Sequence, residues 1–408
     1  MEQLKIYAAT LEESARQQID DMSKCEAYKD CIIRIMPDCH AGAGCTIGTV
    51  IAIKDRIVPN TVGVDIGCGM LVTELGKQEV NLKALDAAIK QEVPSGFMVH
   101  AHAVAHFTKE LAELRCQNVL DMDFANRSIG SLGGGNHFIE LDEDSDGNKY
   151  LVIHSGSRNL GVRVCKHYQD IAINYCRRNS CNEQEIVKQL KAEGREKEIQ
   201  AALQAAKAQS PKVDKELAYL EGEDMKDYLH DMSICQRYAS LNRKVMAFAI
   251  CDTLQLSIHN QFETIHNYID VVHKILRKGA VSALNGEQLI IPMNMRDGSL
   301  LCKGLGNPDW LYSAPHGAGR LMSRKQAFDT LKMQDFTDTM SDIYSTSVCP
   351  ETIDESPMAY KPMQEIIDQI GDTVEIIDII KPIYNFKAKT PEKPDRKALC
   401  HKLLRKED

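Results

Sequence analysis

The sequence lacks the features that would place a protein in a membrane or outside the cell. Its 408 residues contain no uninterrupted apolar run that approaches the roughly 20 residues needed to span a bilayer. The N-terminus, from Met1 to Lys5, leads into a mixed polar sequence without the apolar centre of a signal peptide. We therefore expect a cytoplasmic protein with no membrane partner.

The cysteines lack the spacing of a disulfide framework or of a zinc ribbon. None of the 14 cysteines forms a Cys-x-x-Cys pair, and a reducing compartment would keep most of them as thiols. The formal net charge of −9 argues against a protein that coats nucleic acid by bulk electrostatics. A locally basic groove remains compatible with this charge.

Three common motifs of nucleotide-binding and hydrolytic enzymes are also missing. No Gly-x-x-x-x-Gly-Lys-Ser/Thr sequence occurs, which argues against a P-loop NTPase, and no Rossmann fingerprint is present. No serine or cysteine nucleophile stands in a recognisable elbow. The chain also shows neither an internal repeat nor a low-complexity tract.

The apolar content of 43% is sufficient for a substantial core in one large or two ordinary domains. Short β-rich runs (31–36, 46–53 and 150–154) alternate with glycine turns and one helical segment (82–89), which predicts a mixed sheet up to about residue 160. Residues 181–248 have helical spacing and predict a helical insertion with a break at Ser210-Pro211. Further β-rich runs follow at 265–276 and 288–291, and residues 388–408 form a basic extension.

A carboxylate and a thiol stand three residues apart in the glycine-rich segment from Val64 to Gly69. We expect a turn here that follows a strand, so that Asp65 and Cys68 converge on one point. A thiolate and a carboxylate oxygen together suit several first-row divalent ions. The alternative is a buried cysteine beside an aspartate that stabilises the turn.

Three histidines occupy contexts that could add ligands to this pair. His137 follows three glycines and is flanked by Asn136 and Glu140, so that its loop offers backbone N–H groups to an anion as well as an imidazole. His154 ends a predicted strand ahead of Ser155, Ser157 and Arg158, which could bind phosphate oxygens. His266 gives the weakest signal. Each of these residues could instead be a turn, surface or core histidine.

A fourth histidine, His316, precedes two arginines at spacings of four. Arg320 and Arg324 are expected on one helical face, where two guanidiniums form an anion clamp. A histidine beside such a clamp can attack phosphorus. The alternative is a helix N-terminus with a capping loop. One aspartate, one cysteine, several histidines and several arginines together suggest metal-assisted phosphoryl or nucleotidyl transfer.

These motifs, taken in order, resemble those of RtcB-type RNA ligases nearly from end to end. The matching segments are Met36 to His40, Val62 to Gly69, Gly135 to Glu140, His154 to Arg158, His266 to Tyr268, Arg277 to Ala280, Gly304 to Gly306, His316 to Arg320 and Pro357 to Lys361. The resemblance implies an α+β fold, with mixed β-sheets around a polar metal and nucleotide cleft. It implies one catalytic domain over residues 1–387, with the helical insertion at about 181–248.

The resemblance also implies an activity and its cofactors. Such an enzyme joins RNA ending in a 3′-phosphate or 2′,3′-cyclic phosphate to RNA with a 5′-hydroxyl, using GTP and two Mn²⁺ ions. His316 would be the guanylylated nucleophile. Asp65, Cys68, His137, His154 and His266 would hold the ions, and Arg158, Arg320 and Arg324 would bind RNA phosphates.

Matching positions also imply a guanylate pocket. Its residues would be Asn136, His137, Phe138, Ile139, Glu140, His266, Asn267, Pro292, Met293, Asn294, Met295, Ser299, His316, Gly317, Ala318, Gly319, Tyr360 and Lys387. Glu140 is suited to accept hydrogen bonds from guanine N1–H and the exocyclic amine.

Three segments depart from the family pattern. Pro292 to Met295 replaces a Pro-Gly-Ser-Met turn, the chain continues beyond Lys387 into a basic tail, and residues 92–124, with three histidines, have no match and are interpreted as structural. Two alternative functions remain open. One is a guanylyltransferase that caps RNA 3′-phosphates without sealing, and the other is a nucleotide- or RNA-binding module with a vestigial centre. The sequence leaves open the physiological RNA and any activating protein partner.

Overall fold

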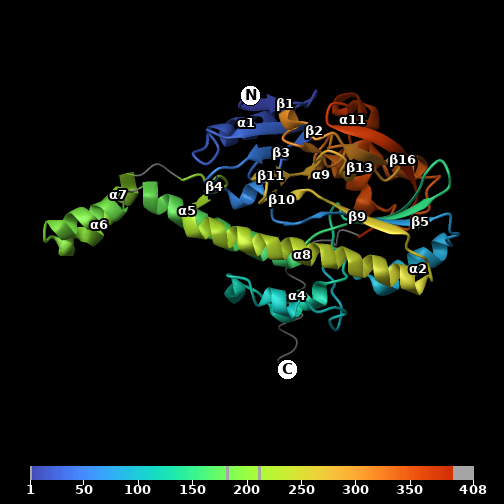
Figure 1. Cartoon of the computed structure of the whole chain (residues 1–408), viewed down its shortest axis with the longest axis horizontal. Helices are drawn as coiled ribbons and strands as arrows, with labels where there is room; N and C mark the ends of the chain where they lie inside the picture. Colours follow the sequence, from blue (N-terminus) through green and yellow to red (C-terminus); the bar gives the residue numbers. More distant parts are fainter. Residues whose placement is uncertain (1, 181–182, 210–212, 389–408) are drawn as a thin grey trace.

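Two large β-sheets, two small two-stranded sheets and a layer of long helices make up the described part of the fold. The computed structural model describes residues 2–180, 183–209 and 213–388 (Figure 1). The predicted α+β class is confirmed, and both large sheets combine strands from distant parts of the chain, but only the five-stranded sheet mixes parallel with antiparallel pairing. Among the described residues, no helix is long and apolar enough to cross a membrane.

The larger sheet has seven strands in the order β13-β14-β16-β6-β7-β5-β9, all antiparallel to their neighbours. Their bounds are β5 (Gly69–Gly76), β6 (Phe138–Glu143), β7 (Lys149–Ser155), β9 (Asn260–Ile265), β13 (Gln288–Asn294), β14 (Gly298–Gly304) and β16 (Val374–Lys387). The strands β5, β6 and β7 are almost continuously buried, because helices pack against one face and apolar side chains of β13, β14 and β16 of the same sheet pack against the other.

The smaller sheet has five strands in the order β1-β2-β3-β11-β10, and only β1 and β2 pair in parallel. Its strands are β1 (Leu4–Ile6), β2 (Ile32–His40), β3 (Ile47–Ala52), β10 (Asn267–Asp270) and β11 (Ile275–Lys278). Two small sheets pair β4 (Arg56–Ile57) with β8 (Leu220–Glu221), and β12 (Ala280–Ser282) with β15 (Ser313–Pro315).

The α-helices are α1 (Glu13–Lys24), α2 (Leu82–Glu92), α3 (Thr108–Leu111), α4 (Met122–Ser128), α5 (Arg158–Ser180), α6 (Glu183–Ala192), α7 (Ile199–Gln209), α8 (Gly222–Thr253), α9 (Arg324–Thr330), α10 (Met333–Thr339) and α11 (Met363–Ile370). The 3₁₀-helices are η1 (Pro59–Thr61), η2 (Gln117–Val119), η3 (Glu196–Glu198), η4 (Pro308–Trp310), η5 (Pro350–Glu355) and η6 (Pro357–Ala359).

The helical segment is longer than the sequence predicted. Helices already begin with α5 at Arg158 and continue through α8 to Thr253, rather than occupying 181–248. Figure 1 shows α8 running along the sheets, with α6 and α7 projecting from one end of the molecule. The helical start was missed because α5 follows β7 directly and includes several β-branched and aromatic residues. The predicted break at Ser210-Pro211 and the tail 389–408 lie outside the described residues.

The two large sheets meet at His266. The chain leaves the seven-stranded sheet at Ile265 and enters the five-stranded sheet at Asn267, so that this one residue lies at their junction. Its backbone N–H donates to the Cys68 carbonyl at 2.9 Å, and its carbonyl accepts from Gly279 N–H at 2.7 Å. The polar site described next is built around this junction.

Candidate active site and metal centre

A cavity of about 540 Å³ lies where the two sheets meet. Most of the residues expected in the site line it, namely Asp65, Cys68, Asn136, Phe138, Glu140, His154, His266, Asn267, Pro292 to Met295, His316 to Arg320, Arg324, Tyr360 and Lys387. These residues come from widely separated parts of the chain. A volume of this size accommodates a nucleotide.

The turn that carries Asp65 and Cys68 is closed by a hydrogen bond from Cys68 N–H to the Asp65 carbonyl at 3.1 Å. Gly67 has φ +72°, a left-handed conformation that glycine adopts without strain. The expectation that this turn follows a strand was wrong. η1 lies before it and β5 begins immediately after it, so Cys68 stands at the entrance of a central strand.

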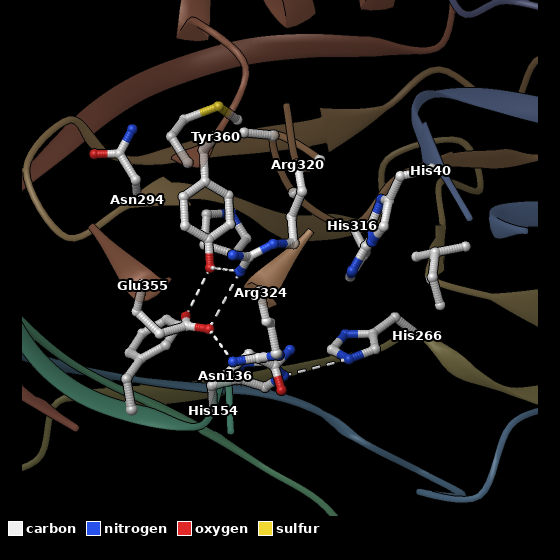
Figure 2. Close-up of a pocket in the computed structure, with 18 of the residues that line it drawn as sticks. His40, Asn136, His154, His266, Asn294, His316, Arg320, Arg324, Glu355 and Tyr360 are labelled. Carbon is white, nitrogen blue, oxygen red and sulfur yellow. Dashed lines mark hydrogen bonds and ion pairs between the residues drawn. The ribbon is translucent and has the colours of Figure 1, made fainter. Parts of the chain in front are cut away.

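Three histidines direct their Nε2 atoms toward one point beside the Cys68 thiol. Cys68 Sγ lies 3.4 Å from His137 Nε2 and 3.3 Å from His154 Nε2. His154 Nε2 in turn lies 3.3 Å from His266 Nε2, and the two rings meet edge to face at an interplanar angle of 70° (Figure 2). The Asp65 carboxylate completes the group through Oδ2, which lies 3.1 Å from His137 Nε2.

The donor set fits divalent metal ions. The ring nitrogen Nδ1 of His137 lies 2.8 Å from the Leu132 carbonyl, which can only accept, so Nδ1 carries the proton and the Nε2 lone pair is free for a metal. Burial holds the pKa values of His154 and His266 well below their usual range, which keeps both imidazoles in the neutral form that ligates. Burial raises the pKa of the Cys68 thiol, and a bound cation would reverse that direction.

Among the described residues, one group of histidine, cysteine and acidic side chains has the spacing of a metal site: Cys68, His137 and His154, whose ligand atoms lie within 4.8 Å of one another. All three are buried. The cluster could therefore hold a metal, and His266 and Asp65 lie at its edge.

His316 faces the cavity with one ring nitrogen already engaged. Its Nδ1 lies 2.6 Å from Oδ2 of Asp38, a fully buried residue at the end of β2. This contact assigns the proton to Nδ1 and leaves Nε2 with a free lone pair. The ring centroid of His316 lies 4.9 Å from that of His266, so the His316 ring lies next to one of the candidate metal ligands.

Glu140 is a buried carboxylate in the wall of the cavity. Burial raises its pKa to about 7, against the opposing effects of the Lys387 ammonium and of a hydrogen bond from Asn385. Asn385 and Lys387 stand opposite Glu140 and Phe138 on the neighbouring strand β16. This register brings the last strand of the described chain into the pocket.

Four polar groups of the cavity converge on Glu355, which is 2% exposed. Its carboxylate lies 2.6 Å from Arg324 Nη1, 2.9 Å from Lys387 Nζ and 3.3 Å from Arg320 Nη1. The Tyr360 hydroxyl donates to it at 2.6 Å (Figure 2). These cations lower the pKa of Glu355 to about 2, against the effect of burial, so that it holds the clamp as a carboxylate.

The two arginines of the clamp do not share a helical face, so that expectation was wrong. α9 begins at Arg324, whereas Arg320 lies in a β-bridge with Tyr360. Their guanidiniums meet because both reach Glu355, and Arg324 also pairs with Asp354. The two guanidiniums therefore do lie close together, but a shared carboxylate and not a shared helical face brings them there.

Four expected residues do not line the cavity. Ile139 points into the opposite core cluster, because side chains alternate along β6. Ser299 is fully buried beside Pro292, and the Arg158 guanidinium donates to Ser131 and to the Gly96 carbonyl. His137 does not line the cavity itself, but its Nε2 contacts the thiol of Cys68, which does.

The unusual turn from Pro292 to Met295 has a structural explanation. Oδ1 of Asn294 accepts the backbone N–H groups of Arg296 and Asp297 at 3.0 and 2.9 Å, and so it closes the hairpin turn between β13 and β14. Met293 and Met295 are 3% and 2% exposed and also belong to apolar clusters, so much of their bulk is packed away from the cavity.

Sequence reasoning assigned no role to three residues that contribute to the site. Asp38 and His40 belong to the Met36 to His40 motif, and the motif alone gave no partner for either side chain. His40 lines the cavity, and its Nδ1 lies 3.0 Å from the Asp38 carbonyl. Glu355 precedes the Pro357 to Lys361 motif, and no local pattern distinguishes it from a surface glutamate.

Comparison with known proteins adds an independent finding. The sequence matches the family model described as tRNA-splicing ligase RtcB over residues 18–127 and 110–388. It is 32% identical to RNA-splicing ligase RtcB of Escherichia coli K12, over 91% of this chain and 94% of that protein. It is 26% identical to tRNA-splicing ligase RtcB of Methanococcus maripaludis, over 83% of this chain and 84% of that protein.

Proposed function

Because the chain belongs to the RtcB family of RNA ligases, we propose that it joins RNA 3′-phosphate or 2′,3′-cyclic phosphate ends to 5′-hydroxyl ends with GTP and Mn²⁺. The observation that carries this proposal is the pair of His316 and Asp38, whose 2.6 Å contact leaves a free imidazole nitrogen beside the ligand cluster. A histidine held in this way is suited to form a covalent bond to phosphorus.

Asp65, Cys68, His137, His154 and His266 would hold two Mn²⁺ ions, which supply Lewis-acid stabilisation of the phosphate oxygens. The convergence of the Nε2 atoms of His137, His154 and His266 supports this assignment. Ligand affinity alone would favour zinc over manganese at thiolate and imidazole donors. The proposal of Mn²⁺ therefore depends on family membership.

In the first step, His316 Nε2 attacks the α-phosphorus of GTP. A phosphorus–nitrogen bond forms, the bond to the β-phosphate oxygen breaks, and pyrophosphate leaves. Asp38 keeps the proton on Nδ1 and stabilises the positive charge that develops on the ring. The guanidiniums of Arg320 and Arg324 stand close enough to the cavity to bind the departing or incoming phosphates.

In the next two steps, GMP moves from His316 to an RNA 3′-phosphate oxygen, and the 5′-hydroxyl then attacks the activated RNA phosphorus. The phosphodiester bond forms as GMP leaves, and the hydroxyl proton is released. A cyclic phosphate is first opened by hydrolysis. His316 is regenerated unmodified, which makes the cycle catalytic.

Guanine would be selected by Glu140, which can accept hydrogen bonds from N1–H and the exocyclic amine. Lys387 lies opposite Phe138 on β16 and reaches Glu355, so that it closes the same side of the pocket. Adenine offers neither of those two donors in the same positions. GTP is therefore the expected nucleotide.

The proposal is tested by incubating the purified protein with α-³²P-labelled GTP and Mn²⁺. Covalent label should appear on the wild-type protein and disappear in His316→Ala. The matched control is His273→Ala, because His273 is a half-exposed histidine that also pairs with an aspartate, Asp270, but lies outside the cavity. Label that survives His316→Ala would refute the proposed nucleophile.

A nicked RNA stem-loop with 3′-phosphate and 5′-hydroxyl ends separates sealing from capping. Joined product is expected with the wild-type protein. Accumulation of a stable 3′-terminal guanylate without joining would instead identify a guanylyltransferase. Normal RNA binding without label or bound metal would identify a binding module.

A further inference from the structure

An exposed aromatic residue stands on the tight turn from Ser95 to Met98. Phe97 is 86% exposed and Met98 is 63% exposed. The turn is closed by Met98 N–H, which donates to the Ser95 carbonyl at 3.2 Å, and Gly96 has φ +67°. The backbone conformation therefore projects Phe97 away from the core.

This turn is fixed to the glycine loop that carries His137. Ser95 and Gly133 form a β-bridge, and Gly96 N–H donates to the Gly133 carbonyl at 2.8 Å. Leu132 N–H donates to the Pro94 carbonyl at 2.9 Å, and the Leu132 carbonyl also holds His137. The position of Phe97 is therefore set relative to the metal cluster.

A low rim of glycines connects the turn to the cavity. A side chain at Gly134 would meet only Gly96, at 3.7 Å, and one at Gly135 would meet only the Arg324 guanidinium, at 3.9 Å. The next residue, Asn136, lines the cavity. The two glycines therefore leave space at the backbone between the cavity and the turn that carries Phe97.

The same path is flanked by positive charge. The Arg158 guanidinium donates to the Gly96 carbonyl at 3.0 Å, directly beneath the turn. Arg324 stands at the other end of the rim, beside Gly135. An exposed aromatic ring at one end of a path with a guanidinium near each end matches the chemistry of single-stranded nucleic acid, in which flat bases alternate with phosphates.

We propose that Phe97 is a stacking platform for a nucleobase of the RNA strand whose end occupies the cavity. This inference rests on the proposed function for the identity of the strand. The strand would cross the rim from Gly135 to Gly96, with its phosphates near Arg324 and Arg158. Stacking uses the face of the base, so the contact is expected to tolerate any RNA sequence.

The test uses the full-length protein, Mn²⁺ and no GTP, with short RNAs that end in a 3′-phosphate or a 5′-hydroxyl. 2-Aminopurine is placed in turn at each of the terminal nucleotides, because stacking quenches its fluorescence. Binding should quench at least one position with the wild-type protein and with Phe97→Tyr. Phe97→Ala should lose that quenching and weaken RNA binding by roughly 5- to 150-fold.

Val272→Ala is the matched control, because Val272 is an apolar residue, 81% exposed, that does not line the cavity. It should bind and quench like the wild-type protein. Thermal unfolding of Phe97→Ala should match that of the wild type, since the ring makes little contact with the core. Equal RNA affinity and equal quenching in Phe97→Ala would overturn the inference. Phe97 would then be a candidate contact for a protein partner and not for RNA.

The failure of this inference is distinguishable from failure of the proposed function. If the wild-type protein is labelled by GTP and seals RNA while Phe97→Ala binds RNA normally, only the stacking platform is refuted. If the wild-type protein neither labels nor seals, the proposed function fails, and the stacking inference falls with it.

Discussion

The Nδ1 atom of His316 lies 2.6 Å from a carboxylate oxygen of Asp38, a residue that is fully buried. The two residues are 278 positions apart in sequence. This contact defines which ring nitrogen is free, and it orients that nitrogen toward the cavity. The role of Asp38 can therefore be tested separately from the role of His316.

Asp38→Asn should slow the covalent labelling of His316 by GTP by about 10²–10⁴-fold. The amide keeps the shape of the carboxylate, but it no longer stabilises the charge on the ring, and its N–H group can impose the other tautomer. The measurement is the single-turnover rate of labelling at saturating GTP. Asp270→Asn, which changes the partly buried aspartate beside His273, is the control. A labelling rate unchanged in Asp38→Asn would contradict the assigned role.

Glu355→Gln should destabilise the protein by roughly 3–5 kcal/mol, because it leaves the largely buried cations Arg320 and Lys387 without their carboxylate. Arg324 also loses this partner but is more exposed and keeps its contact with Asp354. Denaturant unfolding monitored by circular dichroism gives the change in the free energy of unfolding. Glu365→Gln is a suitable control, since the Glu365 side chain is about a quarter exposed and its ion pair with Lys361 is long at 3.7 Å. Equal stability of Glu355→Gln and wild type would show that the cluster contributes nothing net.

The same residue predicts a pH dependence of stability. The pKa of Glu355 is lowered to about 2 in the folded protein, whereas an unfolded glutamate titrates near about 4.3. Its contribution is therefore present above about pH 4.3 and is lost as the pH falls from there through about 2. The difference in the free energy of unfolding between wild type and Glu355→Gln should shrink over this acidic range. A constant difference would contradict the prediction.

The raised pKa of Glu140 predicts a pH dependence of GTP binding. Burial raises its pKa to about 7, so the carboxyl is protonated in the free protein below that pH and loses an acceptor for guanine. GTP affinity should therefore rise as the pH increases from about 6 to about 8. The contribution of Glu140 to the free energy of unfolding decreases with rising pH. It is present at acid pH and is lost as the pH rises through about 7. Glu140→Gln should bind GTP weakly and without this pH dependence, as measured by titration calorimetry.

Metal removal should unload the cluster around Cys68 and lower thermal stability. A ligand that binds only the folded state stabilises it by mass action, so the melting temperature should rise with added Mn²⁺ and fall with a chelator. Cys68→Ala should reduce the bound metal measured by mass spectrometry. Cys251→Ala is the control, because Cys251 is also buried but packs in an apolar cluster away from the cavity. Full metal content in Cys68→Ala would exclude this thiol as a ligand.

Much of the site was predictable because its residues lie in local patterns. Cys68, His137 and His154 each stand where a glycine turn meets a strand, and sequence alone indicates such positions. The α+β class was implied by the family resemblance, and the short β-rich runs separated by a long helical segment agree with it. The start of that segment was misplaced because α5 begins within four residues of His154, inside a motif dominated by glycine and serine.

The sequence could not indicate which side chains meet across the cavity. It placed Arg320 and Arg324 on a common helical face, whereas an irregular segment and the first residue of α9 carry them. It included Ile139 with its neighbours, although alternation along β6 turns that side chain to the opposite core. Periodicity describes one element at a time, and these contacts are made between elements.

The sequence by itself determined the chemical groups of this protein: an aspartate, a cysteine and histidines at glycine-bounded turns, and a histidine followed by arginines. Local backbone preferences act over a few residues, so such motifs can be recognised in the sequence before the fold is known. Only the tertiary structure decided that Asp38 orients His316, that Glu355 holds three cations, and that Phe97 stands at the rim. Sheet register and the packing of distant loops fix these contacts, and their energies arise only when both partners are buried together.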